Sequence, residues 1–208
     1  MVTLVDYGLG NIHAFHHIYT RLNLPVEIAS NPEQLLRAEK IILPGVGAFD
    51  WAMTRLNESG LRETLDDLVL RQKVPVLGIC VGMQMMANSS DEGSLPGLGW
   101  VDAVVKKLSM KTEASQQESN QLALPHMGWN DVVSNRESAL LSGITAPRFY
   151  FLHSYYFVPG QTSQTLATTH YGVEFTSAAA NEHIYGVQFH PEKSHSWGIQ
   201  LLKNFAEL

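Results

Sequence analysis

The first eighty residues alternate short apolar runs with helical patterns. Strand-like runs lie at residues 2–5, 26–28, 40–43 and 74–79. Helical patterns cover residues 12–22 and 61–72, and Asn-Pro-Glu at residues 31–33 predicts the start of a short helix. Strands without polar alternation are buried on both faces, so this half predicts a parallel sheet covered by helices on both sides.

The second half is different, because strand-like runs dominate it. They lie at residues 101–108, 129–133, 149–158, 165–169 and 184–189, before a closing helix over residues 197–208. We therefore expect an α/β fold: a mostly parallel central sheet flanked by helices, with antiparallel strands added in the C-terminal half. Residues 109–121 are polar and predict a mobile loop. No repeat or linker divides the chain, so we expect a single domain over residues 1–208.

Composition narrows the class of protein. The chain has 208 residues, a formal net charge of −6 and one cysteine. One cysteine excludes an intrachain disulfide and a multi-cysteine zinc site. The acidic balance argues against nucleic acid or an anionic membrane as a partner. No signal peptide or membrane span is apparent, so we expect a cytoplasmic protein.

The single cysteine, Cys80, lies in Gly-Ile-Cys-Val-Gly at residues 78–82, directly after an apolar strand and before helix-compatible residues. Gly-x-nucleophile-x-Gly between strand and helix is the nucleophile-elbow pattern, in which glycines allow a tight turn and close backbones. A helix N-terminus and a nearby imidazolium would favour the thiolate. A lone cysteine is more often a buried structural residue, but its position here favours the nucleophile.

His190 and Glu192 are the candidate base and its orienter. They follow a strand-like run, and in an extended segment residues two apart point the same way. Pro191 is expected to keep this segment extended. Glu192 would then hold one ring nitrogen and leave the other for the sulfur, as in a catalytic triad.

Two alternatives remain open for this pair. The chain has nine histidines, and five of them besides His190 stay as weaker candidates for the base: His126, His153, His170, His183 and His195. His190 and Glu192 could also join Cys80 as metal ligands, although no second ligand pair is clustered nearby.

An oxyanion formed at a thiolate needs two aimed donors. The backbone N–H of Val81 is one candidate, and the N–H of Val46 or Gly47 is the second. Gly47 leaves that peptide free to rotate, so the hole need not be preformed. The alternative for residues 44–47 is an ordinary Gly/Pro turn.

Two further segments suggest a substrate pocket. Gln84 lies four residues after Cys80, on the same helical face, although it could equally be an ordinary surface residue of that helix. Residues 149–157 are aromatic and predict a core strand, in which Ser154 is the small polar exception.

These segments together resemble the class I glutamine amidotransferases, nearly end to end and in the same order. The resemblance rests on PGVG at 44–47, GICVGMQ at 78–84, PHMGWN at 125–130, HSY at 153–155 and GVQFHPEK at 186–193. Within the family, they look most like the glutaminase subunits of imidazole glycerol phosphate synthases, enzymes of histidine biosynthesis.

The resemblance implies a mechanism. Cys80 would attack the side-chain amide of glutamine, His190 would shuttle protons, and Glu192 would orient His190. The pocket would be lined by Gly47, Gln84, His153, Ser154 and Tyr155.

The resemblance also implies a partner: a (β/α)₈-barrel synthase subunit that forms a heterodimer with this chain and receives ammonia through a protected channel. Asn11 and Lys193 would face this partner, unless they are merely a helix-start residue and a solvated lysine. Neither a cofactor nor a metal is implied.

Some residues depart from the commoner pattern. Residues 6–15 and Val81 look closer to a paralogous group that supplies ammonia for amidation of a surface-polysaccharide sugar. The glutaminase chemistry is the same in both groups, so this departure affects only the ammonia acceptor. Two more hypotheses use the same fold differently: a free-standing γ-glutamyl hydrolase, and a non-catalytic binding module.

Overall fold

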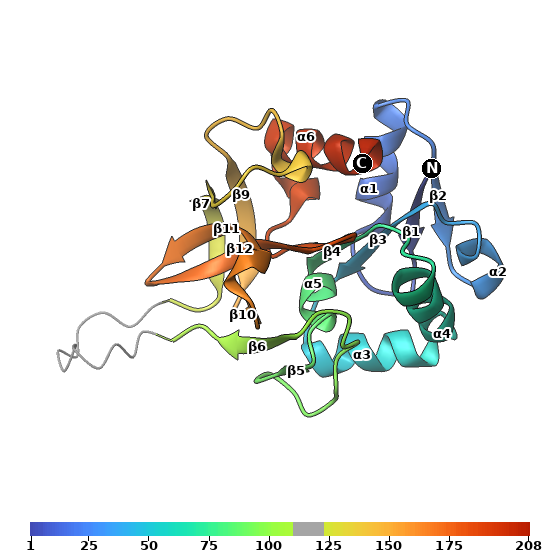
Figure 1. Ribbon diagram of the computed structural model, residues 1–208, viewed down its shortest axis with the longest axis horizontal. Helices are drawn as coiled ribbons and strands as arrows, with labels where there is room; N and C mark the ends of the chain where they lie inside the picture. Colours follow the sequence, from blue (N-terminus) through green and yellow to red (C-terminus); the bar gives the residue numbers. More distant parts are fainter. Residues whose placement is uncertain (110–122) are drawn as a thin grey trace.

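The computed structural model describes residues 1–109 and 123–208, and an eight-stranded sheet is the largest element of these residues (Figure 1). In spatial order its strands are β2 (Val26–Ala29), β1 (Val2–Val5), β3 (Lys40–Gly45), β4 (Val76–Cys80), β13 (Ile184–Val187), β12 (Val173–Asn181), β11 (Thr165–Tyr171) and β8 (Val133–Ser134). Strands β2, β1, β3, β4 and β13 are parallel, whereas β12, β11 and β8 continue the sheet antiparallel. The expected fold class is therefore confirmed.

Helices cover both faces of the parallel half, as its apolar strands require. Figure 1 shows α1 (Ile12–Arg21) and α6 (His195–Glu207) on one face. The other face carries α3 (Phe49–Glu58), α4 (Arg62–Asp66) and α5 (Val81–Met85), while the short α2 (Pro32–Leu35) packs beside β2. Strands β1, β3 and β4 are almost completely buried as a result.

The described residues form two further, smaller sheets. One has the order β10 (Tyr155–Pro159), β6 (Ala103–Lys107) and β5 (Ser89–Ser90). The other pairs β7 (His126–Asp131) with β9 (Arg148–His153). Four short turns of helix complete the described elements: Asp67–Arg71, Ala139–Leu141, Thr162–Gln164 and Pro191–Lys193.

Three elements differ from the sequence prediction. Helix α3 was not predicted, although its buried residues Phe49, Ala52, Met53 and Leu56 follow helical spacing. Strand β12 was also missed, because it is buried on both faces and contains three consecutive alanines, which have low strand propensity. The aromatic segment 149–157 is not one strand: it breaks at Ser154 into β9 and β10, which belong to different sheets.

The polar loop expected over residues 109–121 lies outside the described residues, except for Ser109. Among the described helices, none has the length and apolar character needed to cross a membrane.

Candidate active site

Cys80 is the last residue of β4 and directly precedes α5, as the elbow pattern predicts. Its backbone has φ 55° and ψ −111°, a strained conformation for a residue with a side chain. The side chain is 3% exposed and lines a cavity of about 340 Å³. The turn thus holds the sulfur at the carboxyl end of the sheet, where α/β proteins commonly bind ligands.

The two glycines of the elbow are required by close backbone contact. A Cβ at Gly78 would lie 2.7 Å from the backbone nitrogen of Met83. A Cβ at Gly82 would overlap the carbonyl oxygen of Leu43 in the neighbouring strand β3. The helix can therefore approach the sheet this closely only with glycine at both positions.

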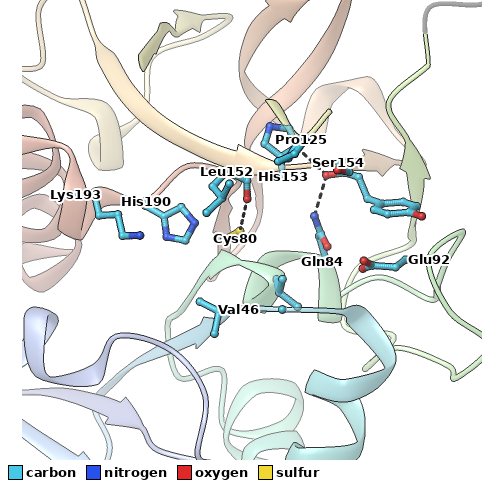
Figure 2. Close-up of a pocket in the computed structure, with 13 residues that line it drawn as sticks. Val46, Cys80, Gln84, Glu92, Pro125, Leu152, His153, Ser154, His190 and Lys193 are labelled. Carbon is cyan, nitrogen blue, oxygen red and sulfur yellow. Dashed lines mark hydrogen bonds between the residues drawn. The ribbon is translucent and has the colours of Figure 1, made fainter. Parts of the chain in front are cut away.

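His190 follows β13, the strand next to β4, so the sheet brings it to Cys80 (Figure 2). Its Nδ1 lies 2.9 Å from Oε1 of Glu192, and both side chains are buried. The segment is not extended, contrary to the sequence prediction. Pro191–Lys193 forms a 3₁₀ turn, because proline is well suited to the first position of a helical turn, and this turn brings the two side chains together.

The electrostatics of His190 suit a charged imidazole. Burial of the ring lowers its pKa, but hydrogen bonding with Cys80 and Glu192 and the negative charges of both groups outweigh burial. The pKa of His190 is raised to about 10. At neutral pH this arrangement therefore favours an imidazolium beside the sulfur.

The backbone of His190 is fastened to β9. Its N–H donates to the carbonyl oxygen of Tyr150 over 2.8 Å. The buried hydroxyl of Ser194 donates to the carbonyl oxygen of His190 and accepts from the N–H of Tyr150, over 2.6 and 3.0 Å. The candidate base is therefore held between two strands rather than on a free loop.

The cavity contains the residues that were expected in a substrate pocket. All five line it: Gly47, Gln84, His153, Ser154 and Tyr155. Gln84 is held by its amide nitrogen, which donates to the carbonyl oxygen of Tyr155 over 2.9 Å (Figure 2). The same nitrogen donates to Oε1 of Gln188 over 3.0 Å.

The candidate oxyanion donors also border the cavity, since Val46, Gly47 and Val81 line it. Val81 is the first residue of α5, where N–H groups lack an intrahelical acceptor. Gly47 has φ +83°, which only glycine adopts readily.

Tyr7 supports the segment that carries Val46 and Gly47. Its buried hydroxyl donates to the carbonyl oxygen of Pro44 over 2.7 Å. Burial, and to a smaller extent the charge of Cys80, raise the pKa of Tyr7, so the hydroxyl stays protonated. Gly10 packs closely on the ring of Pro44, where a Cβ would lie 2.8 Å from Pro44 Cβ. The loop after β1 thus buttresses the end of β3, directly before Val46 and Gly47.

The weaker candidate histidines occupy different settings. His126, His170, His183 and His195 do not line the cavity. His183 Nε2 contacts the carbonyl oxygen of Val69 over 2.7 Å, and the ring of His195 stacks on Trp129. In residues 1–109 and 123–208, no group of three or more His, Cys, Asp or Glu side chains is arranged to hold a metal ion.

His153 lines the cavity, but both of its ring nitrogens have protein partners. Nδ1 lies 2.9 Å from the carbonyl oxygen of Tyr155, and Nε2 lies 3.0 Å from Nδ1 of His126. Nε2 of His126 in turn faces the amide nitrogen of Asn130 over 3.2 Å. A carbonyl only accepts and an amide N–H only donates, so both histidines are neutral and carry their proton on Nδ1. Burial lowers the pKa of His153 to about 3 and that of His126 to about 4.

Glu92 lines the cavity but was not singled out from the sequence. It lies in a turn after β5, and its carboxylate accepts the backbone N–H of Phe49 over 2.9 Å. Figure 2 shows it on the side of the cavity where Gln84 lies. No local pattern marks this residue, because only the fold brings the turn to the pocket.

Of the two residues expected to face a partner, Lys193 borders the cavity and Asn11 does not line it. Lys193 lines the cavity, and its Nζ lies 5.7 Å from the centre of the Tyr150 ring. Asn11 is exposed at the start of α1 and follows Gly10, which contacts Pro44.

An exposed apolar face lies beside Lys193, on the two-stranded sheet. Met127 is 65% exposed and pairs with Leu152, which is 37% exposed and lines the cavity. Trp129, paired with Tyr150, is 36% exposed on the same face. Exposed apolar residues that gather in this way are typical of a protein interface.

Comparison with known proteins gives consistent results. The family described as glutamine amidotransferase class-I matches residues 3–208. The chain is 57% identical over 209 residues to "imidazole glycerol phosphate synthase subunit HisH" of Bdellovibrio bacteriovorus, with 100% of both chains covered. It is 46% identical to the protein of the same name from Leptospira borgpetersenii, again over 100% of both chains.

Solved structures show the same fold at lower identity. A glutamine amidotransferase superposes with a TM-score of 0.73 at 18% identity, covering 99% of this chain and 97% of that one. A chain of PurLQS from Thermotoga maritima superposes with a TM-score of 0.71 at 14% identity, covering 99% and 97%.

Proposed function

The chain belongs to the class I glutamine amidotransferase family, and from this premise we propose that residues 1–208 form the glutaminase subunit of an imidazole glycerol phosphate synthase. It hydrolyses glutamine to glutamate and ammonia, and the ammonia passes to a (β/α)₈-barrel partner subunit for histidine biosynthesis. One observation carries the chemistry: Cys80 lies at a strained elbow beside His190, whose Nδ1 is held by Glu192.

The first half of the reaction forms a thioester. The Cys80 thiolate attacks the side-chain amide carbon of glutamine and forms an S–C bond. The tetrahedral oxyanion collapses as the C–N bond breaks, and the His190 imidazolium gives its proton to the leaving nitrogen, which departs as ammonia. A raised pKa for His190 supports this role, because the imidazole is charged and ready to donate.

The second half of the reaction releases glutamate. Neutral His190 takes a proton from water, which attacks the thioester carbon. Collapse of the second tetrahedral intermediate breaks the S–C bond and restores the thiolate and the imidazolium. Glu192 remains a carboxylate throughout and holds the ring with its Nδ1–H directed away from the sulfur.

We assign the oxyanion hole to the N–H of Val81 and to an N–H of Val46 or Gly47. These residues border the cavity on the two loops that flank Cys80, and the positive φ of Gly47 gives its peptide freedom to turn.

The α-ammonium of glutamine is assigned to Glu92 and Gln84. Glu92 supplies a carboxylate on the cavity wall. Both hydrogens of the Gln84 amide nitrogen are directed at protein acceptors, so its oxygen is the atom left for an ammonium. Gly47, His153, Ser154 and Tyr155 complete the pocket wall.

The partner is assigned to the face formed by Met127, Trp129 and Leu152, with Lys193 and Asn11 at its margins. This face is apolar, exposed and continuous with the cavity through Leu152. A partner seated there would cover the cavity mouth and receive ammonia without loss to solvent. The relatives support a two-subunit enzyme, since their names describe subunits.

The test is to co-purify the chain with its native barrel partner and measure glutamate release and formation of imidazole glycerol phosphate. The wild-type complex should give both products from glutamine, and Cys80→Ala should leave the complex intact but release no glutamate. Glutamine-dependent amidation of a sugar in place of imidazole glycerol phosphate would assign the paralogous pathway. Full activity of the isolated chain on γ-glutamyl peptides, unchanged by the partner, would instead show a free-standing hydrolase.

A further inference from the structure

Gln188 is a fully buried polar residue at the centre of the site, between β13 and His190. Its backbone N–H donates to the carbonyl oxygen of Ser177 in β12 over 2.9 Å, which fixes the position of its Cα. A buried amide must find partners for both its oxygen and its nitrogen. The proposed reaction gives this side chain no role at the sulfur, although its oxygen helps to hold Gln84.

The partners of the Gln188 amide are Gln84 and Cys80. Its Oε1 accepts from Nε2 of Gln84 over 3.0 Å, and its Nε2 donates to Sγ of Cys80 over 3.7 Å. We infer that Gln188 acts on the nucleophile: its amide N–H holds the Cys80 sulfur in place and stabilises the thiolate. This inference deepens the proposed function and rests on it for its catalytic meaning.

The direction of the amide follows from its neighbours. The carbonyl oxygen of Tyr155 can only accept, so Gln84 must turn its Nε2 toward it. The same nitrogen faces Gln188, which must therefore present its oxygen to Gln84 and its nitrogen to the sulfur. The reverse orientation would place two N–H donors against each other and a carbonyl oxygen against a thiolate.

The Tyr155 carbonyl that sets this direction is itself held in place. His153 Nδ1–H donates to it, and His153 is locked in this tautomer by His126. The orientation at the sulfur thus depends on a chain of buried, neutral groups that reaches β7.

The sulfur has different partners in its two protonation states. As a thiol it can donate to the carbonyl oxygen of Leu152, 3.9 Å away. As a thiolate it has no proton to donate, and the Gln188 N–H remains as a donor to it. Because the sulfur is almost entirely buried, water replaces little of this interaction, and hydrogen bonds to a buried charged atom are comparatively strong.

Two substitutions separate this role from packing. Gln188→Met keeps a neutral side chain of similar length without any N–H. Gln188→Glu keeps an oxygen that can accept from Gln84, but places a second carboxylate oxygen, instead of an N–H donor, toward the sulfur. Ser177→Ala is the matched control: its hydroxyl is buried with no hydrogen-bond partner among the described residues, and the hydrogen bond between Ser177 and Gln188 uses only backbone atoms.

The measurement is the rate of Cys80 alkylation by iodoacetamide between pH 5 and 10, on the folded isolated chain, with thermal unfolding recorded in parallel. In both Gln188 variants the rate profile should move to higher pH. The rate at pH 7 should fall about tenfold, the size expected from loss of one hydrogen bond to a charged atom. In the complex with the partner, Gln188→Met should lower kcat, while Ser177→Ala behaves as wild type in both assays.

The inference is overturned if Cys80 in a folded Gln188→Met variant is alkylated at the wild-type rate at every pH. It is also overturned if both variants lose the fold, because Gln188 would then serve packing alone. Alkylation requires neither glutamine nor the partner. The role of Gln188 at the sulfur can therefore fail or succeed separately from the proposed reaction.

Discussion

Oε1 of Glu192 lies 2.9 Å from Nδ1 of His190, and the side chains of the two residues are only 2% and 4% exposed. A buried carboxylate at this distance selects the tautomer with the proton on Nδ1 and leaves Nε2 to exchange protons at the sulfur. In the proposed mechanism, this contact orients the base, and it stabilises the charged form of His190.

Glu192→Gln should retain the shape of this contact but lose its charge and its tautomer preference. We expect glutamine turnover in the complex to fall by about 10²–10⁴, the range typical for the orienting member of a triad, with little change in KM. Steady-state glutamate production measures this effect. Glu182→Gln is the control, because Glu182 is 74% exposed. Turnover within threefold of wild type would show that Glu192 does not orient the base.

Gly82→Ala should disrupt the elbow, because a Cβ there overlaps the carbonyl oxygen of Leu43. The helix would have to move away from β3, at a cost of about 3 kcal/mol or more in unfolding free energy. Gly60→Ala is the control: it has φ +76° but no atom within 4 Å, so only the left-handed backbone penalty of about 1–2 kcal/mol applies. Urea unfolding compares the two, and equal losses would contradict the close contact.

Tyr7→Phe should loosen the segment that carries Val46 and Gly47, because the phenol hydroxyl no longer holds the carbonyl oxygen of Pro44. We expect a loss of about 1 kcal/mol in stability together with reduced glutaminase turnover. Tyr19→Phe removes a similar buried hydrogen bond, to Leu202 in α6, and neither Tyr19 nor Leu202 lines the cavity. It should lose similar stability but keep full turnover. Equal glutaminase turnover in the two variants would show that the Tyr7 hydroxyl does not support catalysis.

The His126–His153 pair should make the fold sensitive to acid. Burial lowers the pKa of His126 to about 4 and that of His153 to about 3. In the unfolded chain both histidines take up a proton near pH 6.5, whereas in the folded chain they stay neutral at that pH. The stability they contribute is complete above pH 6.5 and is lost as the pH falls toward 3. Urea midpoints between pH 7 and 4 should decline less steeply in His153→Gln. If the urea midpoints of wild type and His153→Gln decline equally with pH, residues other than this pair cause the acid sensitivity.

Met127→Glu should weaken association with the partner subunit by about tenfold or more, since it introduces a charge into the proposed apolar contact face. Leu36→Glu is the control. Leu36 is similarly exposed at 59%, but it ends α2 beside β2, at the opposite edge of the central sheet from β7 (Figure 1). Analytical ultracentrifugation or titration calorimetry measures both. If both variants bind the partner subunit with equal affinity, the interface does not include the exposed face of β7 and β9.

Sequence patterns predicted the parts of the fold that rest on local periodicity. The apolar strands and the Gly-flanked Cys80 could be placed because each signal lies within a few residues. Strand β12 could not, because burial on both faces removes the alternation that marks a strand.

In the site, too, local patterns were predicted from the sequence and long-range contacts were not. His190 and Glu192 were expected to meet, but through an extended segment rather than the 3₁₀ turn that joins them. Glu92 and Gln188 reach the cavity and the sulfur through long-range packing, which a linear pattern does not encode.

The position of β13 also determines when the site can be assembled during synthesis. Residues 184–187 insert between β4 and β12, so β4 remains an edge strand until residues 184–187 have left the ribosome. Until then Cys80 has neither His190 nor Gln188 beside it, although its own strand is made more than a hundred residues earlier. A nascent or truncated chain is therefore expected to carry an ordinary thiol next to an open sheet edge, which is prone to aggregation. Chemical reactivity at Cys80 thus reports completion of the fold.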